Sequence, residues 1–244
     1  MSKLTLLASV GTVACAAASV SHRVLHLSSP RRDIAVAATS HAVVIAGGCA
    51  DSNTTSPYVC NYPTSDIDVF SPKTHHVLSL SSARAWSSAC AVGDAVVIAG
   101  GGTTAAKSAA ADIVDTVHLT VASNESALSE ARWGIACAST RNAVVFAGGL
   151  STEYTDAVDV YSARDNSWSA SEFHISSKRE SMGALSSVDA TSVSFLGGWN
   201  EHGEPPNFAT VDSFNLTSGQ SHVSALNAVS YWTGGVSVSG PSTY

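Results

Sequence analysis

Aromatic and polar side chains that do not recur elsewhere in the chain are its best candidates for chemistry. Trp199, Glu201 and His202 stand together in the stretch WNEHGEPPNFAT, and Tyr154 stands in LSTEYTDA. Aromatic rings beside carboxyl and imidazole groups stack on sugar rings or anchor a peptide. Two more candidates closely follow an arginine and are expected at the same rim: Trp86 and Trp133. The alternative is that these rings only pack on neighbouring strands.

Arginine and aspartate, by contrast, recur at intervals of roughly 50 residues. The arginines are Arg31, Arg84 and Arg132, with a displaced fourth copy, Arg179; the aspartates are Asp68, Asp115, Asp159 and Asp212. A residue written in every repeat serves the architecture more often than a ligand. The favoured interpretation is therefore that the aspartates accept hydrogen bonds from backbone or from the arginines. The alternative is that Arg31, Arg84 and Arg132 form a ring of cations for an acidic partner.

Other classes of chemistry find little support in the sequence. Nine histidines are spread along the chain, and no H-E-x-x-H, C-x-x-C or G-x-S-x-G motif occurs, so we expect no metal site and no cofactor. The chain carries 12 Lys and Arg against 19 Asp and Glu, a formal charge of −7, with no basic run. A nucleic-acid partner is therefore not expected, because phosphate binding needs clustered cations.

A repeated heptapeptide predicts the strands that must position these residues. AVVIAGG begins at Ala42 and again at Ala95, AVVFAGG begins at Ala143, and a looser SVSFLGG begins at Ser192. The first glycines of the four pairs are separated by 53, 48 and 49 residues. Such a period indicates a propeller or an array of similar units. Each unit is predicted to contain four short strands, of which AVVIA is apolar on both faces and therefore buried on both.

The chain resembles the kelch repeat. The resemblance rests on the Gly pairs 47/48, 100/101, 148/149 and 197/198, the arginine before each first strand, the V-D-V-Y-like strands and Trp168. It implies an all-β fold, a kelch-type β-propeller whose blades are four-stranded sheets around a channel. Residues 22–244 are then the propeller, with four full blades and a split or incomplete fifth. In that fifth blade RVLHLSSPRR, from Arg23, matches HVLSLSSAR, from His76, and NAVSYWTGGVSVSG resembles two first strands. The alternatives are an unusually small ring and a truncated piece of a larger one.

The N-terminus predicts export. Residues 1–21 have one lysine, an uncharged stretch and small residues before His22, which is the pattern of a secretory signal peptide. Three N-x-S/T sequons are candidate glycosylation sites: Asn53, Asn124 and Asn215. A secreted or extracellular glycoprotein without a membrane span is expected; if the N-terminus belongs to the fold, the cytoplasm is the alternative.

The cysteines divide into two predicted kinds. Cys49 and Cys60 bracket a short loop between neighbouring strands and are expected to form a disulfide. Cys90 and Cys137 lie in the first strands of adjacent units. Since face-packed sheets lie about 10 Å apart, these two are expected to be buried free thiols.

The sequence thus predicts a secreted binding module that recognises a protein or a glycan through loops on one propeller face. The alternative is a carbohydrate-active enzyme, an oxidase or isomerase, because kelch-like propellers include a copper radical oxidase and a sialic-acid isomerase. The Tyr and His copper ligands of the former are not found in this sequence. An intracellular adaptor subunit is a third possibility.

Overall fold

The computed structural model describes residues 24–50, 59–170, 173–203 and 207–230. The predicted signal peptide, 1–21, and the sequon at Asn53 lie outside the described residues. The described part is all-β and forms four antiparallel sheets of four strands, each built from consecutive strands in chain order. This confirms the expectation of four short strands in each repeat.

The strand bounds repeat with the sequence. The first sheet contains β1 (Ala35–Ala38), β2 (Val43–Ala46), β3 (Asp66–Phe70) and β4 (His75–Ser79). The second contains β5 (Ser88–Val92), β6 (Ala95–Ala99), β7 (Ala111–Asp115) and β8 (Thr120–Asn124). The third contains β9 (Ala136–Ser139), β10 (Ala143–Ala147), β11 (Val158–Ser162) and β12 (Ser167–Ala170). The fourth contains β13 (Gly183–Ser186), β14 (Ser192–Leu196), β15 (Phe208–Asn215) and β16 (Gln220–Ser230).

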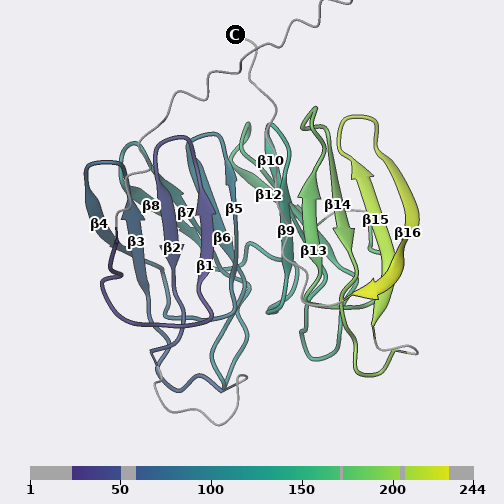
Figure 1. Ribbon diagram of the computed structural model, residues 1–244, viewed down its shortest axis with the longest axis horizontal. Coiled ribbons are helices and arrows are strands. Elements are labelled where there is room, and N and C mark those ends of the chain that lie inside the picture. Colours follow the sequence, from purple (N-terminus) through teal and green to yellow (C-terminus); the bar gives the residue numbers. More distant parts are fainter. Residues whose placement is uncertain (1–23, 51–58, 171–172, 204–206, 231–244) are drawn as a thin grey trace, which may run out of the picture.

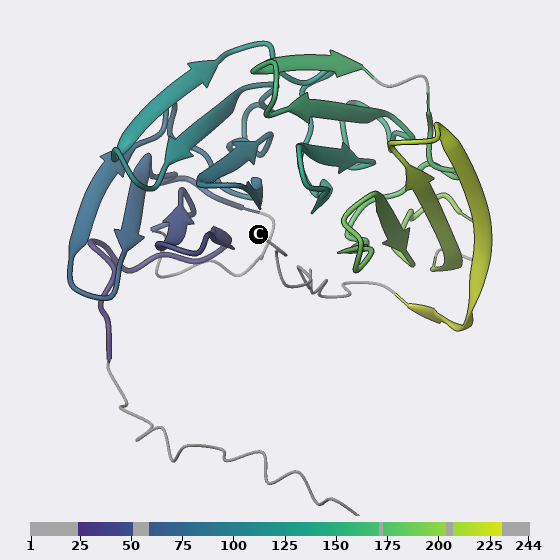
Figure 2. The ribbon, with the colours of Figure 1, turned by 90° about the horizontal axis from the view of Figure 1, so that it is seen from above.

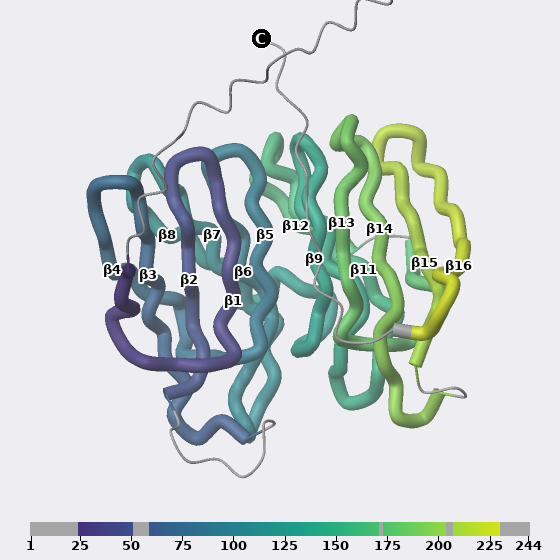
Figure 3. Tube along the Cα trace, viewed as in Figure 1, coloured from purple at the N-terminus to yellow at the C-terminus, as the bar shows by residue number. Residues whose placement is uncertain are grey.

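The four sheets stand side by side in an arc, with the first strand of each sheet inside and the fourth outside (Figure 2). The first and fourth sheets are the two ends of this arc, as the chain trace also shows (Figure 3). Because each inner sheet has a neighbour on both faces, the repeated apolar strand is buried on both, as in β6, where Val96, Val97 and Ile98 are fully enclosed.

Three apolar layers fill the spaces between the sheets. One, between the first two sheets, includes Val44, Ile67 and Ile98. The next is built around Val97 and Phe146, and the third includes Phe195.

The repeated Gly-Gly pair ties each sheet to the next one. Gly100 adopts a φ of +67°, and a Cβ at this position would lie 2.7 Å from the carbonyl oxygen of Arg132, in the segment that leads into the third sheet. Its neighbour Gly101 donates its N–H to that same oxygen at 2.9 Å. Glycine is therefore required both by the left-handed backbone and by the close approach. The same N–H bond joins Gly48 to Arg84 and Gly149 to Arg179.

The prediction that Cys90 and Cys137 are free thiols is wrong. They form a disulfide with a Cα–Cα distance of 6.1 Å. Inner strands converge near the centre of the arc, so the spacing of about 10 Å between flat packed sheets does not apply there. The two cysteines stand one residue apart in the alignment of the repeats, and this offset favours the bond. Cys137 is level with Ala89, both facing the preceding sheet, so Cys90, one residue on, faces the third sheet and meets Cys137.

Candidate functional site

One edge of the arc, at the bottom of Figure 1, collects the loops after β2, β6, β10 and β14 and the segments that lead into β1, β5, β9 and β13. We call this edge the loop face and the opposite edge, with the tight turns, the turn face. All nine residues predicted to bind a ligand belong to the loop face: Arg31, Arg84, Arg132, Trp86, Trp133, Tyr154, Trp199, Glu201 and His202.

The recurring arginines are enclosed and paired. Arg84 is 1% exposed; its Nε donates to the carbonyl of Gly100 at 3.0 Å, and its Nη2 lies 2.6 Å from a carboxylate oxygen of Asp112. The same pairing recurs in the other three sheets: Arg31 with Asp68, Arg132 with Asp159 and Arg179 with Asp212. A guanidinium already held by a buried carboxylate is costly to withdraw for an outside ligand. The structure therefore favours the architectural role of these arginines over a cation ring.

Serines complete each of these pairs. The backbone N–H and the hydroxyl of Ser81 both donate to the carboxylate of Asp112. Ser28, Ser129 and Ser176 hold the other three aspartates in the same way. For Asp68, burial raises the pKa, but hydrogen bonds from Arg31, His75 and Ser28 outweigh it, so the pKa lies below the usual value.

The aspartate of the second repeat is Asp112, and its assignment to Asp115 is wrong. Strand pairing places Asp112 opposite Ile98, as it places Asp159 opposite Phe146 and Asp212 opposite Phe195. Asp115 is instead the last residue of β7, next to the turn that follows. Its carboxylate bonds to the backbone N–H and the ring of His118, and this lowers the pKa of Asp115 to about 2.

Two tryptophans meet at the centre of the loop face. The rings of Trp86 and Trp133 lie 5.1 Å apart, edge to face, and the ammonium of Lys107 lies 4.4 Å from the centre of the Trp133 ring. Trp86 has a φ of +56°, a left-handed conformation that costs free energy for a bulky residue. The contact between the two rings therefore requires the backbone of Trp86 to adopt an unfavourable conformation.

A second aromatic group stands beside the first. Tyr154 packs edge to face against Trp199, with ring centres 5.7 Å apart, and against His202 at 6.2 Å. Glu201 is exposed next to His202, with Oε1 and Nε2 3.5 Å apart. The structure thus brings together the aromatic candidates of three different repeats.

Glu180 joins the two groups and was missed from the sequence. It exchanges two backbone hydrogen bonds of 2.9 Å with Trp199, and a Cβ on Gly134 would lie only 2.4 Å from its Oε2. Its place in the repeat was a signal: Glu180 follows Arg179 directly, as Trp133 follows Arg132. We call this set the loop-face cluster: Trp86, Lys107, Trp133, Tyr154, Glu180, Trp199, Glu201 and His202.

The predicted disulfide packs against one residue of the loop-face cluster, Trp86. Cys49 and Cys60 are bonded with a Cα–Cα distance of 5.7 Å and are fully buried. They pack with Ala85 and with the half-buried ring of Trp86. This confirms the prediction and fixes the two ends of the longest loop on this face.

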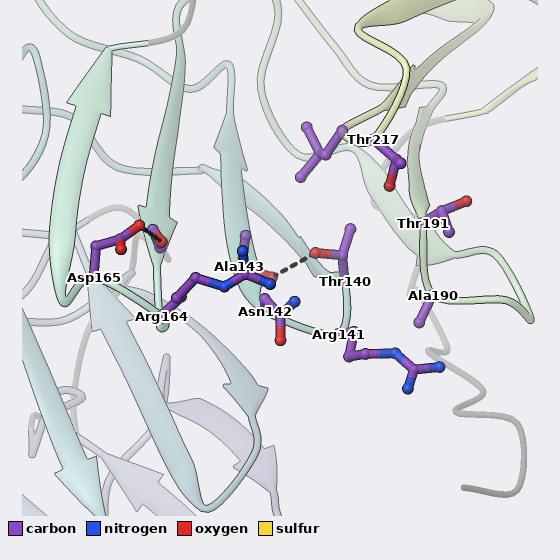
Figure 4. Close-up of a pocket in the computed structure, with 11 residues that line it drawn as sticks. Thr140, Arg141, Asn142, Ala143, Arg164, Asp165, Ala190, Thr191 and Thr217 are labelled. Carbon is purple, nitrogen blue, oxygen red and sulfur yellow. Dashed lines mark hydrogen bonds between the residues drawn. The ribbon is translucent and has the colours of Figure 1, made fainter. Parts of the chain in front are cut away.

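The turn face has a cleft of a different kind (Figure 4). It encloses about 410 Å³ between the turns of the third and fourth sheets, and its polar lining includes Thr140, Arg141, Arg164 and Asp165. In Figure 4 the side chain of Arg164 extends towards Ala143 and Thr140, whereas that of Arg141 extends away from them. This cleft therefore lacks convergent groups, whereas the loop-face cluster has them.

No protein-family model matches the chain, and no curated protein matches it significantly. Within the described residues, no group of three or more His, Cys, Asp or Glu is placed to hold a metal ion. The described segments also contain no helix with the length and apolar character of a membrane span. The two disulfides fit an oxidising compartment.

Proposed function

We propose that the chain is a kelch-type β-propeller with four full blades and a split fifth. The arc of four equivalent sheets and the four equivalent arginine–aspartate pairs support this proposal. Residues 24–27 lead to Ser28, whose bonds to Asp68 match those of Ser81 to Asp112. Residues 24–27 therefore precede the first sheet in the same way as β4, the fourth strand of the first sheet, precedes the second sheet.

We further propose that the protein is exported. The two disulfides support this proposal, and Asn124 is exposed at the end of β8, where an N-glycan has room. N-terminal sequencing of protein from the medium is expected to begin between Ser19 and His22; an intact Met1 would contradict export by a cleaved signal.

The propeller is proposed to be a binding module that recognises a protein or a glycan through the loop face. One observation carries this: residues that differ between repeats gather in the loop-face cluster, while the residues common to all repeats are buried and paired. Aromatic rings with a polar edge are the groups that dominate binding sites of both kinds.

The test compares the two faces of the molecule. The protein is screened on glycan and peptide arrays, together with a loop-face variant, Trp86→Ala with Trp199→Ala, and a turn-face variant, Arg141→Ala with Arg164→Ala. We expect binding to be lost in the first variant and kept in the second, with the melting temperatures of both measured alongside. Loss of binding in the turn-face variant alone would contradict the proposal.

The enzyme alternative has one observation in its favour. Burial raises the pKa of Glu180 to about 7, Lys107 lowers it, and the carboxylate of Glu201 raises it further. Two carboxyls within electrostatic reach, one of them titrating near neutrality, are suited to proton transfer such as an isomerase performs. Incubation of sugars with the protein in D₂O tests this, because isomerisation by proton transfer would bring deuterium into the sugar C–H bonds.

A further inference from the structure

Glu180 is a buried acid without a partner. The residue is only 9% exposed, and within the described chain its carboxylate makes no hydrogen bond and no ion pair. The other buried carboxylates, such as Asp112 and Asp159, each hold an arginine. An ionised carboxylate left in this state costs free energy that a cation of the right shape would return.

The carboxylate of Glu180 has room because Gly134, next to it, has no side chain. Gly134 occupies the position that in the other repeats carries Asp33, Trp86 and Ser181, and all four have a left-handed φ of 55° to 65°. Any side chain here would overlap Oε2 of Glu180. Only in the third repeat does glycine stand at this position, so the carboxylate of Glu180 can lie directly against the backbone beside Trp133.

A second acceptor without a donor stands on the other side of Trp199. The backbone of Trp199 pairs with Glu180 on one side and with Asn207 on the other. The side-chain oxygen of Asn207 is buried and has no hydrogen-bond partner in the described structure. The carboxylate of Glu180 and the side-chain oxygen of Asn207 thus belong to the two segments that pair with the backbone of Trp199, and both can accept hydrogen bonds from a ligand.

The protein itself shows that this region accepts a cation. The ammonium of Lys107 lies 4.4 Å from the centre of the Trp133 ring, within the range of a cation–π contact. Lys107 makes no ion pair with Glu180 within the described residues. The charged groups that face Glu180 are Lys107, from the loop after β6, and Glu201, from the loop after β14.

We propose that the loop-face cluster binds a guanidinium or ammonium group carried by a partner peptide, with Glu180 as its counter-ion. This inference rests on the proposed function and specifies its ligand. A guanidinium has several donors for the Glu180 carboxylate and the Asn207 oxygen, and a flat face for the surrounding rings. A sugar would donate hydroxyl hydrogens but would leave the charge of Glu180 uncompensated.

The probe is N-acetyl-arginine amide, and its matched control is N-acetyl-citrulline amide, which has nearly the same shape without the charge. Binding is followed by NMR through the tryptophan indole signals of the full chain. We expect the arginine derivative to bind at least about tenfold more tightly. Its affinity is expected to fall by about tenfold per pH unit below pH 7, because protonation of Glu180 removes the counter-ion.

Three variants locate the effect. Glu180→Gln is expected to abolish both the preference for arginine and its pH dependence, whereas Glu153→Gln, at an exposed acid of the same face, is expected to change neither. Lys107→Met is expected to tighten binding because it removes a competing cation. Equal binding of citrulline, or unchanged binding in a folded Glu180→Gln variant, would overturn the inference.

The inference and the proposed function fail in distinguishable ways. A glycan that binds the loop face without competition from the arginine derivative would overturn the inference and leave the binding function standing. If the loop-face variant Trp86→Ala with Trp199→Ala retains every interaction found on the arrays, the binding function itself is wrong.

Discussion

At the scale of single residues, the chain separates what the fold needs from what differs between repeats. The guanidiniums at the four equivalent positions are buried against aspartates, whereas the next residue along the chain changes from Arg32 to Ala85, Trp133 and Glu180. The repeated arginine thus serves the fold, and the variable residue that follows it supplies a side chain to the loop face.

The buried pairing of arginine with aspartate predicts different effects for two aspartates that are three residues apart, Asp112 and Asp115. Asp112→Asn leaves the buried Arg84 without its counter-ion and is expected to lower the free energy of unfolding by about 3–5 kcal/mol. Asp115→Asn keeps an oxygen that can accept the backbone N–H groups of Val117 and His118 and loses only the exposed ion pair with His118, so it is expected to cost less than about 1 kcal/mol. Urea denaturation of the two variants decides between them, and equal costs would show that the repeat is aligned wrongly.

Glu180 predicts how stability depends on pH. Its pKa is raised from 4.5 to about 7, so the folded state binds a proton that the unfolded state has released at the same pH. Stability is therefore expected to fall by about 3 kcal/mol between pH 4.5 and 7 and to level off above. Glu180→Gln should remove this contribution and be the more stable protein at pH 8. Urea denaturation across this pH range measures it, and parallel curves for the two proteins would contradict it.

The sequence carried the aromatic candidates but not Glu180, for a physical reason. Trp86, Tyr154 and Trp199 are large, infrequent residues in predicted loops, and these properties are evident from the amino-acid sequence. What distinguishes Glu180 is burial without a partner, which depends on the missing side chain of Gly134 in a neighbouring sheet. A contact between repeats of this kind has no local signature.

At the scale of elements, strand content and order followed from the period, but the geometry between sheets did not. The heptapeptide and the turn residues located β2, β6, β10 and β14. The bond between Cys90 and Cys137 depended instead on how closely β5 and β9 approach at the centre of the arc. That distance is set by the curvature of the whole assembly, which no single repeat encodes.

The two disulfides are predicted to differ in their contribution to stability. In the chain-entropy estimate, a bond between residues 47 apart contributes about 4 kcal/mol, against about 3 kcal/mol for residues 11 apart. Replacing Cys90 and Cys137 by alanine is therefore expected to lower the unfolding midpoint more than replacing Cys49 and Cys60. Non-reducing peptide mapping checks the connectivity, and alkylation of Cys90 in the unreduced protein would contradict it.

At the scale of the molecule, the two ends of the arc differ in character. The free face of the fourth sheet carries Ser194 and Ser213, bonded to each other at 2.8 Å, where the third sheet has Val145 and Val160. Serine at these positions makes this face of the fourth sheet more polar than the matching face of the third. The free face of the first sheet keeps its apolar residues: Val36 is 50% exposed, Val43 40% and Val77 52%.

The exposed valines of the first sheet are the strongest argument for a fifth blade. Val43 occupies the position that Val96, Val144 and Val193 occupy in the other sheets, and those three are fully buried against the preceding sheet. In the sequence Val236-Ser237-Val238-Ser239, apolar and polar residues alternate. The segment predicted to contribute strands to the split blade, 231–244, lies outside the described residues.

Alanine substitution measures whether Val43 is covered. If the fifth blade closes the ring, Val43→Ala is expected to cost about 1.5–3 kcal/mol, as much as Val144→Ala, because both remove methyl groups from a packed core. Val188→Ala, at a residue 73% exposed, provides the baseline of less than about 0.5 kcal/mol. In a chain ending at Ser230 the cost at Val43 should fall to that baseline, while the cost at Val144 stays. A low cost at Val43 in the full chain would mean that the first sheet is uncovered and the ring is open.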